Sequence, residues 1–344
     1  MREGWTYKKL NEVCDKSSSN IVINKLDDNN GDYPLFGASG LVKNVDFYHQ
    51  DKPYIGIVKD GAGVGRVNTY PAYSSLVGTM QYIFPKEECL LNYVKYFLVK
   101  LDLSHCVSGA TIPHIYFKDY GKELIPVPPL STQLSIVSEL DKINELIRLK
   151  KEQLKDYDNL AQSIFYEMFG DPGVNEKGWE VKKFADLYKL KSGDSLSAKN
   201  FVEGEIPVYG GNGISGYHND FNMDGDFIII GRVGVYCGNV REVHGKFWLT
   251  DNAFQLFYNR EIQYPCFIHY LLEILDLHKY ANAAAQPVIS NLTLKDVEII
   301  IPPLPLQQLF AQRIELIERQ KAEIQSTIAD LETLLASRMQ YWFD

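Results

Sequence analysis

The chain has 344 residues, more than a single hydrophobic core usually supports, so we expect two domains. Hydrophobic residues at 45% and charged residues at 23% are ordinary for a soluble globular protein, and no apolar run approaches the roughly 20 residues of a membrane helix. The net charge of −9 argues against a ligand held by a large basic surface, although it leaves room for a local basic face on either half.

The start of the chain, its cysteines and its histidines exclude further classes. Residues 1–5 lack the apolar core of a signal peptide, so we expect a cytoplasmic protein. The five cysteines form no Cys-x-x-Cys pair, and the seven histidines form no His-Glu-x-x-His motif. We therefore expect free thiols, with neither a disulfide framework nor a metal site.

The sequence matches itself when it is shifted by 173 to 174 residues. Gly4-Trp5 then falls on Gly178-Trp179, and Pro128-Pro129-Leu130 falls on Pro302-Pro303-Leu304. The interiors of the two copies have diverged. This pattern favours two similar modules, each of which meets its own half of a two-part target.

Within the first module, residues 1–130, short apolar runs alternate with glycine-containing turns. The run at 54–58 predicts a strand that leads into a glycine-rich loop, and 93–103 predicts a short helix. The second copy repeats both elements at 227–230 and 267–277. Each module is therefore predicted to be α+β.

Two stretches, 131–171 and 305–344, have a different pattern. Their apolar residues alternate at spacings of four and three, which predicts a long amphipathic helix that begins where each Pro-Pro-Leu ends. Such a helix spans roughly 57 Å at about 1.5 Å per residue. The predicted seam and partner-contact residues are Ile136, Leu140, Ile143, Ile147, Leu154 and Ile164, and in the second helix Ile314, Ile317, Ile324, Ile328, Leu331 and Leu335.

Each apolar seam must be buried, and two arrangements would achieve this. Each helix can pack on its own module, or the two helices can pack on each other as an antiparallel coiled coil. The second arrangement is favoured because the seam is too long for one small module to cover. The predicted fold is α+β, with two similar α/β domains at 1–130 and 172–304, separated by a coiled coil of 131–171 and 305–344.

Two pairs of loops carry candidate functional residues. The motif Gly61-Ala62-Gly63-Val64-Gly65 differs from the dinucleotide fingerprint Gly-x-Gly-x-x-Gly, because Arg66 stands at the position of its third glycine. The motif also leads into a strand, so a tight turn is predicted. Small loops also let backbone approach DNA closely, and the loops at 36–40 and 209–217 carry serine and asparagine that suit either turns or base contacts. The candidate DNA-binding residues are Ser39, Lys43, Lys59, Arg66, Asn212, Ser215, Arg232, Arg241 and Lys246.

Motifs for bond chemistry are missing from the sequence. There is no Asn-Pro-Pro-Tyr motif of amino-methylating enzymes and no Gly-x-x-x-x-Gly-Lys-Ser/Thr phosphate loop. Glu180-Val181-Lys182, with Asp171 upstream, resembles the end of a nuclease motif, but the short spacing favours a chance match. We therefore predict no catalytic residues.

The chain resembles the specificity subunits of type I restriction-modification systems. The resemblance rests on the runs 125–133 and 299–307, each of which leads into a long heptad helix. Ala110-Thr111-Ile112-Pro113 and Ala285-Gln286-Pro287-Val288 also fit. One departure is that no glutamate precedes Gln133 or Gln307, where the family often has one.

The resemblance implies a division of labour. Each module would be a target recognition domain that reads one half of a split DNA sequence, and the helices would act as a ruler and as the docking surface for two methylation subunits. S-adenosylmethionine is expected in those partners, and ATP and magnesium in restriction subunits. The alternative hypothesis is a duplicated coiled-coil adaptor without a DNA ligand, which the missing basic excess supports.

Overall fold

The computed structural model describes residues 2, 4–109, 111–282 and 286–344. Ala110 and Ala285, which carry part of the family resemblance, lie outside the described residues. The chain forms two compact units: Met1–Lys151 with Gln325–Asp344, called unit 1, and Glu152–Ile324, called unit 2. Each unit takes in part of both long helices, and the four predicted segment bounds stay a prediction.

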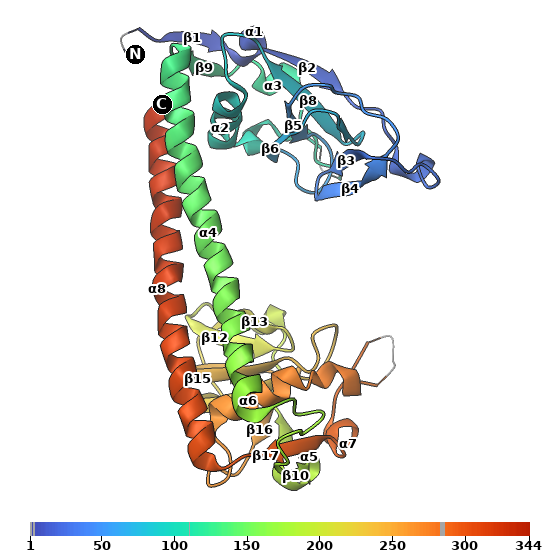
Figure 1. Cartoon of the computed structure of the whole chain (residues 1–344), viewed down its shortest axis with the longest axis vertical. Helices are drawn as coiled ribbons and strands as arrows, with labels where there is room; N and C mark the ends of the chain where they lie inside the picture. Colours follow the sequence, from blue (N-terminus) through green and yellow to red (C-terminus); the bar gives the residue numbers. More distant parts are fainter. Residues whose placement is uncertain (1, 3, 110, 283–285) are drawn as a thin grey trace. The chain divides into compact units, whose positions relative to one another are not determined.

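Unit 1 is a mixed unit built on a four-stranded sheet of order β2-β8-β5-β6 (Figure 1). A three-stranded sheet β4-β3-β7 and the pair β1-β9 complete it. Its strands are β1 Thr6–Lys9, β2 Cys14–Ser18, β3 Tyr33–Gly37, β4 Gly40–Val45, β5 Tyr54–Val58, β6 Val67–Tyr70, β7 Ser75–Leu76, β8 Met80–Pro85 and β9 Leu124–Val127. Its short helices are α1 Leu10–Val13, α2 Leu91–Leu101 and α3 Phe117–Tyr120, with 3-10 turns at Ile23–Lys25 and Leu103–Cys106.

Unit 2 repeats this plan with one six-stranded sheet of order β11-β16-β14-β15-β12-β13 and the pair β10-β17. Its strands are β10 Glu180–Lys183, β11 Lys189–Ser192, β12 Ile206–Gly210, β13 Gly213–His218, β14 Met223–Gly231, β15 Val240–Leu249, β16 Ala253–Phe257 and β17 Glu298–Ile301. Its short helices are α5 Phe184–Leu187, α6 Pro265–Ile274 and α7 Asn291–Leu294, with 3-10 turns at Ala198–Asn200 and Leu277–Tyr280. The mixed α/β content of both modules confirms the predicted class.

The sheets of the two units differ at one strand. In unit 2, β15 runs unbroken for 10 residues and pairs with β14 on one side and β12 on the other. In unit 1, the matching stretch is split into β6 and β7, with Pro71 directly after β6. Proline cannot donate to a strand ladder, so the single sheet of unit 2 becomes two sheets in unit 1.

The two long helices are α4, Leu130–Phe169, and α8, Leu304–Phe343, so both stretches predicted to be long helices are helical (Figure 1). In unit 1 the first turns of α4 pack with the end of α8 on the module core through Ile136, Leu140 and Phe343. In unit 2 the end of α4 packs with the start of α8 on the other core. Within each unit, residues of both helices therefore pack on the module core, and the antiparallel coiled coil stays a prediction.

The buried face of each long helix is shifted by one residue in its last turns. Ile164 is only half-buried, whereas its neighbours Phe165 and Phe169 are fully buried. The same shift by one residue occurs in α8, where Trp342 is half-buried and Phe343 is 6% exposed. A straight helix of 3.6 residues per turn drifts by about 20° per heptad, and over several heptads the buried position moves to the next residue.

Most other predicted seam residues are buried, and two basic residues that lie among them in the sequence have acidic partners. Ile143, Ile147, Ile317, Ile324 and Ile328 are at most 8% exposed, whereas Leu154, Leu331 and Leu335 are half-buried. In unit 2, Lys321 lies 2.8 Å from the Asp158 carboxylate of α4. In unit 1, Arg338 is paired with Glu139 of α4. These pairs allow a cation on an otherwise apolar face.

A buried glutamine fixes the start of each long helix. Gln133 is fully buried, its side-chain oxygen accepts the Leu90 N–H at 2.9 Å, and its amide donates to the carbonyls of Glu88 and Pro128. Gln307 is equally buried and makes the matching bonds in unit 2, to Tyr264, Ile262 and Pro302. The glutamine of the family motif therefore has a structural role, because it satisfies three backbone groups that would otherwise be buried without partners.

Candidate nucleic-acid interface

The glycine-rich loop of unit 1 connects β5 to β6 and is a tight turn, as predicted. Gly61, Gly63 and Gly65 all have positive φ angles of 83° to 88°, which side-chain-bearing residues rarely adopt. The loop lies against a second loop: Gly61 N–H donates to the Pro113 carbonyl at 2.9 Å, and Ile115 N–H donates to the Lys59 carbonyl at 2.9 Å. Two segments far apart in sequence thus form one paired-loop edge.

Unit 2 builds the same edge from diverged residues. Gly234 N–H donates to the Pro287 carbonyl at 2.9 Å, and Ile289 N–H donates to the Arg232 carbonyl at 3.0 Å. Both bonds join residues that lie 173 or 174 positions after the residues of the matching bonds in unit 1. The paired-loop edge is therefore a common feature of the two modules, while its exposed side chains differ between them.

The basic candidates on these edges are held differently. In unit 1, Arg66 is exposed, whereas the Lys59 side chain is 25% exposed and its ammonium lies 3.6 Å from the Asp60 carboxylate. In unit 2, Arg232 is half-buried and donates to Ser192 Oγ at 3.3 Å and to the Asp251 carbonyl at 3.2 Å. Arg66 is thus exposed to solvent, whereas Arg232 forms hydrogen bonds within its own module.

In unit 2 the structure brings three candidates together around the β12–β13 turn. Asn212 is exposed at its tip, and the guanidinium of the exposed Arg241 lies directly beside Gly213. The turn packs on the start of the glycine-rich loop that carries Arg232: a Cβ on Gly231 would lie 2.2 Å from the Gly211 oxygen. Glycine is required there because the two backbones touch.

The remaining candidates do not converge in this way. Ser39 is exposed at the tip of the β3–β4 turn, and Lys43 donates to the Leu26 carbonyl at 2.7 Å, which ties the hairpin to the preceding loop. Ser215 donates to the Val208 carbonyl at 3.1 Å, within its own hairpin. The Lys246 ammonium lies 4.5 Å from the centre of the Phe221 ring. These contacts give three of the four residues structural partners, and their role toward DNA stays a prediction.

The sequence interpretation missed exposed apolar residues on the same edges. Ile112 is 62% exposed in unit 1, and Val235 and Tyr236 are 77% and 51% exposed in unit 2. Such residues can contact thymine methyl groups or sugars. A loop carries no hydrophobic periodicity, so only its position beside the glycine motif could have indicated them.

The nuclease-like residues have structural partners instead. The Asp171 carboxylate accepts the Gly173 N–H at 2.8 Å within a turn, and Lys182 lies 3.1 Å from Glu180 on the same strand. Among the described residues, no group of histidine, cysteine and carboxylate side chains is arranged to hold a metal ion. Over the same residues, no helix combines the length and apolar character needed to cross a membrane.

Comparison with known proteins places the chain in a class. The family described as "Type I restriction modification DNA specificity domain" matches residues 2–156 and again residues 176–333, so the chain belongs to this family. The two matches coincide with the two repeats. The class of the chain is accordingly that of the type I restriction-modification specificity subunits.

Individual relatives agree with this assignment. The specificity subunit of the type I restriction enzyme EcoprrI of Escherichia coli is 29% identical over 204 residues, which are 55% of this chain and 50% of that protein. A putative type I specificity subunit of Mycoplasma pneumoniae is 26% identical over 219 residues, 60% of this chain and 80% of that protein. The chain thus matches about half the length of the first relative.

Solved structures show the same fold. The S subunit of a type I restriction-modification system from M. genitalium superposes with a TM-score of 0.61 at 17% identity, covering 99% of this chain and 96% of that one. A chain from a structure on complex assembly and conformational transition of the type I R-M system gives a TM-score of 0.58 at 18% identity, covering 99% and 98%.

Proposed function

We propose that this chain gives a type I restriction-modification complex its DNA sequence specificity, and that each module reads one half of a bipartite target. The observation that carries the proposal is the paired-loop edge, which has the same backbone hydrogen bonds in both units and different exposed side chains. The same backbone arrangement with different exposed side chains suits two half-sites of different sequence. Several base contacts at two half-sites provide more discrimination than one, since each good bidentate contact contributes about 1–3 kcal/mol.

The long helices are proposed to set the distance between the half-sites and to dock two methylation subunits. Leucines outside the seam support the docking role: Leu134 is 58% exposed on α4 and Leu316 is 60% exposed on α8. On α4, Leu134 lines one open groove together with Val137 and Leu146, and contiguous exposed apolar surface is typical of protein interfaces. The partners would hold S-adenosylmethionine, and restriction subunits, where the system has them, would hold ATP and magnesium. All would act on DNA in the cytoplasm.

A module exchange tests the proposal. Residues 172–304 would be replaced by the corresponding module of another family member, and the chain would be assembled with its methylation subunits on genomic DNA. We expect sequencing of methylated adenines to show one half-site changed and the other retained. An unchanged target would refute the assignment of the modules as readers.

The helices are tested by changing their length. Removing or adding four residues in α4 and α8 together should alter the spacing between the two methylated half-sites, because DNA half-sites must lie a set rise and twist apart. Variants that methylate sites with unchanged spacing would show that the helices do not measure the gap.

Single substitutions test the basic candidates. Arg66→Ala, Lys59→Ala and Arg232→Ala should each weaken DNA binding by the assembled complex and reduce its salt dependence by about one phosphate contact. Because Arg232 also donates to Asp251 and Ser192, its variant needs a parallel check of thermal stability. Equal affinity and an equal salt slope would reject a residue as a contact.

A protein adaptor without a DNA ligand is the second candidate, and the net charge of −9 favours it. The module exchange separates the two functions. An adaptor would leave the methylated sequence unchanged and would alter only which proteins assemble.

A further inference from the structure

The residues that follow the glycine-rich loop are the same three types in both units, in opposite order. Unit 1 has Arg66-Val67-Asn68, and unit 2 has Asn239-Val240-Arg241. The central valine is buried in each unit, and the residues on both sides of it are exposed. Arginine and asparagine thus exchange places around a buried residue, directly beside each paired-loop edge.

The backbone around the two triplets is the same. In unit 1, Val58 N–H donates to the Arg66 carbonyl at 3.0 Å, and in unit 2, Gly231 N–H donates to the Asn239 carbonyl at 2.9 Å. Arg66 and Asn239 therefore occupy equivalent positions, and so do the residues two places further along. One unit has its guanidinium where the other has its amide.

Both triplets lie at an edge of their sheet. β6 is the last strand in the order β2-β8-β5-β6. β15 pairs with β12 only at Trp248 and Leu249, so among the described residues the start of β15 has a strand partner, β14, on one side only. The major groove of DNA admits a two-stranded ribbon, and β5–β6 and β14–β15 each present such a ribbon.

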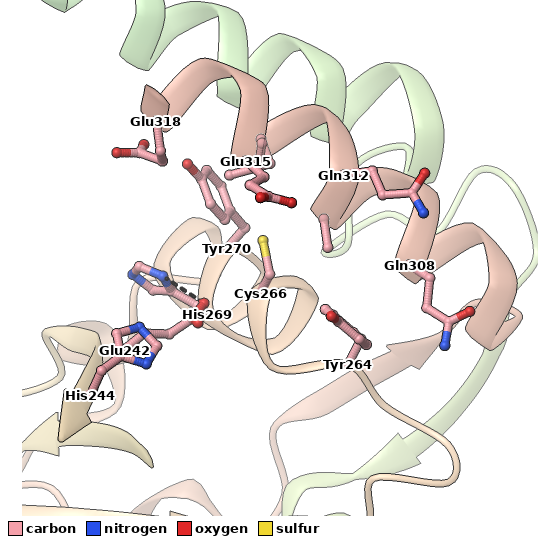
Figure 2. Close-up of a pocket in the computed structure, with 12 residues that line it drawn as sticks. Glu242, His244, Tyr264, Cys266, His269, Tyr270, Gln308, Gln312, Glu315 and Glu318 are labelled. Atoms are coloured by element: carbon pink, nitrogen blue, oxygen red, sulfur yellow. Dashed lines mark ion pairs between the residues drawn. The ribbon is translucent and has the colours of Figure 1, made fainter. Parts of the chain in front are cut away.

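The two faces of β15 differ. Glu242 and His244 line a groove against α6 and α8, where the Glu242 carboxylate lies 3.4 Å from His269 Nδ1 (Figure 2). Successive side chains of a strand point to opposite faces, so Arg241 points away from this groove. Its guanidinium lies beside Gly213, in the β12–β13 turn. The cation is thus directed toward the candidate interface and away from the carboxylate on the same strand.

Both guanidinium groups lie against a glycine. A Cβ on Gly63 would lie 2.9 Å from the guanidinium carbon of Arg66, and a Cβ on Gly213 would lie 3.3 Å from that of Arg241. Over the part of the chain that the structure describes, no ion pair engages either group. The carboxylates that share a cleft with Arg241 have other partners, Glu273 with His269 and Asp276 with Lys279.

The amide of Asn68 is oriented by its neighbour. Burial raises the pKa of the Tyr70 hydroxyl, and a hydrogen bond from the Asn68 side chain opposes that rise. An amide has two N–H donors and one carbonyl oxygen, so a bond to Tyr70 leaves one N–H and the oxygen available. These are the groups with which asparagine contacts adenine, donating to N7 and accepting from N6.

We propose that each triplet reads a guanine and an adenine of its half-site, with arginine on guanine and asparagine on adenine, and that the order of the two bases, counted from the glycine-rich loop, is opposite in the two half-sites. A guanidinium donates to both O6 and N7 of guanine. The inference rests on the proposed function and deepens it, because it assigns Arg66 and Arg241 to base edges. Two triplets of equal composition and charge then differ only in the order that they read.

Exchanging the two residues within unit 1 tests this order. Arg66→Asn with Asn68→Arg keeps the composition and net charge. The variant would be assembled with its methylation subunits and used to select DNA in which the half-site of unit 1 is randomised. We expect the two base pairs to be exchanged, with at least about tenfold preference for the exchanged half-site over the native one, which corresponds to about 1.4 kcal/mol. Continued preference for the native half-site, or a folded variant that selects no sequence, would overturn the proposal.

The same exchange in unit 2 checks that the effect belongs to one module. Asn239→Arg with Arg241→Asn should exchange the two base pairs in the other half-site and leave the half-site of unit 1 as it is. In both exchanged variants the salt dependence of binding should be unchanged, because the number of cations is the same. A changed sequence in both half-sites, or in neither, would contradict the assignment.

The opposite edge of the unit 1 sheet provides a matched control. Lys16 and Ser18 are exposed on β2, two positions apart. Lys16→Ser with Ser18→Lys moves a cation by the same step, and we expect the selected sequence to stay the same. A change of sequence in this control would show that displacing a charge is sufficient, and base reading by the triplets would be rejected.

Failure of this inference can be distinguished from failure of the proposed function. If the module exchange leaves the methylated sequence unchanged, the modules are not readers and the proposed function fails. If the module exchange alters one half-site but the residue exchange does not, only the assignment of the triplets fails.

Discussion

The two units attach the end of a long helix to the first strand of a module in different ways. In unit 2 the chain itself makes the connection: α4 ends at Phe169, and the turn that follows returns to Trp179, whose indole N–H donates to the Phe169 carbonyl at 2.8 Å. In unit 1 the end of α8 meets Trp5 through side chains. The Arg2 guanidinium lies 4.7 Å from the Trp5 ring and 4.4 Å from the Tyr341 ring.

The difference shows that one packing arrangement can be held by chain connectivity or by a cluster of side chains. Phe169 and Phe343 occupy matching positions and both belong to a module core. Around Phe343, however, the supporting contacts are the cation–π contact of Arg2 with the Tyr341 ring and the Arg338–Glu139 ion pair. Salt and pH can weaken the ion pair. We therefore expect the helix end to open more easily in unit 1 than in unit 2.

The largest expected effect comes from removing the matching phenylalanines. Phe169→Ala should destabilise unit 2 by about 3–5 kcal/mol, as is usual for a fully buried aromatic residue, and Phe343→Ala should cost unit 1 less because the last helical turn opens more readily. Native-state hydrogen exchange, followed separately for amides of each unit, would measure both. Tyr166→Ala, 44% exposed on α4, is the control. Equal losses would mean that connectivity contributes nothing.

The buried glutamines should behave alike in the two units. Gln133→Ala and Gln307→Ala each remove three hydrogen bonds, and we expect each to cost about 2–3 kcal/mol because buried backbone groups lose their partners. Exchange should rise only in the unit that carries the change. The exposed neighbour Gln308→Ala serves as control, and a loss of similar size there would contradict the role of the buried amide.

Much of the fold could be predicted because local patterns determine it. The β-branched run at 54–58 matches β5 residue for residue, and the heptad seams predicted both long helices. The errors arise where a pattern accumulates small deviations or depends on distant residues. The seam drifted from Ile164 to Phe165 over several heptads, and the merging of two sheets through β15 depends on pairing with both β12 and β14.

The candidate site was predictable only in part. Glycine spacing indicated the tight turns, since positive φ angles demand glycine regardless of tertiary context. The pairing of Gly61 with Pro113 joins loops about fifty positions apart, and no local pattern encodes it.

The cation stack of unit 1 should contribute a smaller amount. Arg2→Ala removes contacts with three aromatic rings, and we expect a loss of about 1 kcal/mol. Hydrogen exchange should increase in β1 and in the last turn of α8, with unit 2 unaffected. The matched position in unit 2 is Glu176, and Glu176→Ala should leave exchange in β10 unchanged. An equal response of both units would show that the stack is not what holds the helix end.

The smallest expected effect is a dependence on pH confined to unit 1. The hydrogen bond from Arg338 lowers the pKa of the Glu139 carboxyl below its ordinary value, and Trp342 donates to the same group at 3.0 Å. The folded state thus favours the carboxylate, so its contribution is complete above the ordinary glutamate pKa and is lost as pH falls through the lowered value. Because the pair is partly exposed, we expect it to contribute less than about 1 kcal/mol to the stability of unit 1.

Unit 2 has Arg313 and Ile164 at the matching positions and lacks this pair. Below about pH 4, exchange near the end of α8 should therefore rise in the unmodified chain. Glu139→Gln should remove the pH dependence, and a variant that keeps it would place the titrating group elsewhere.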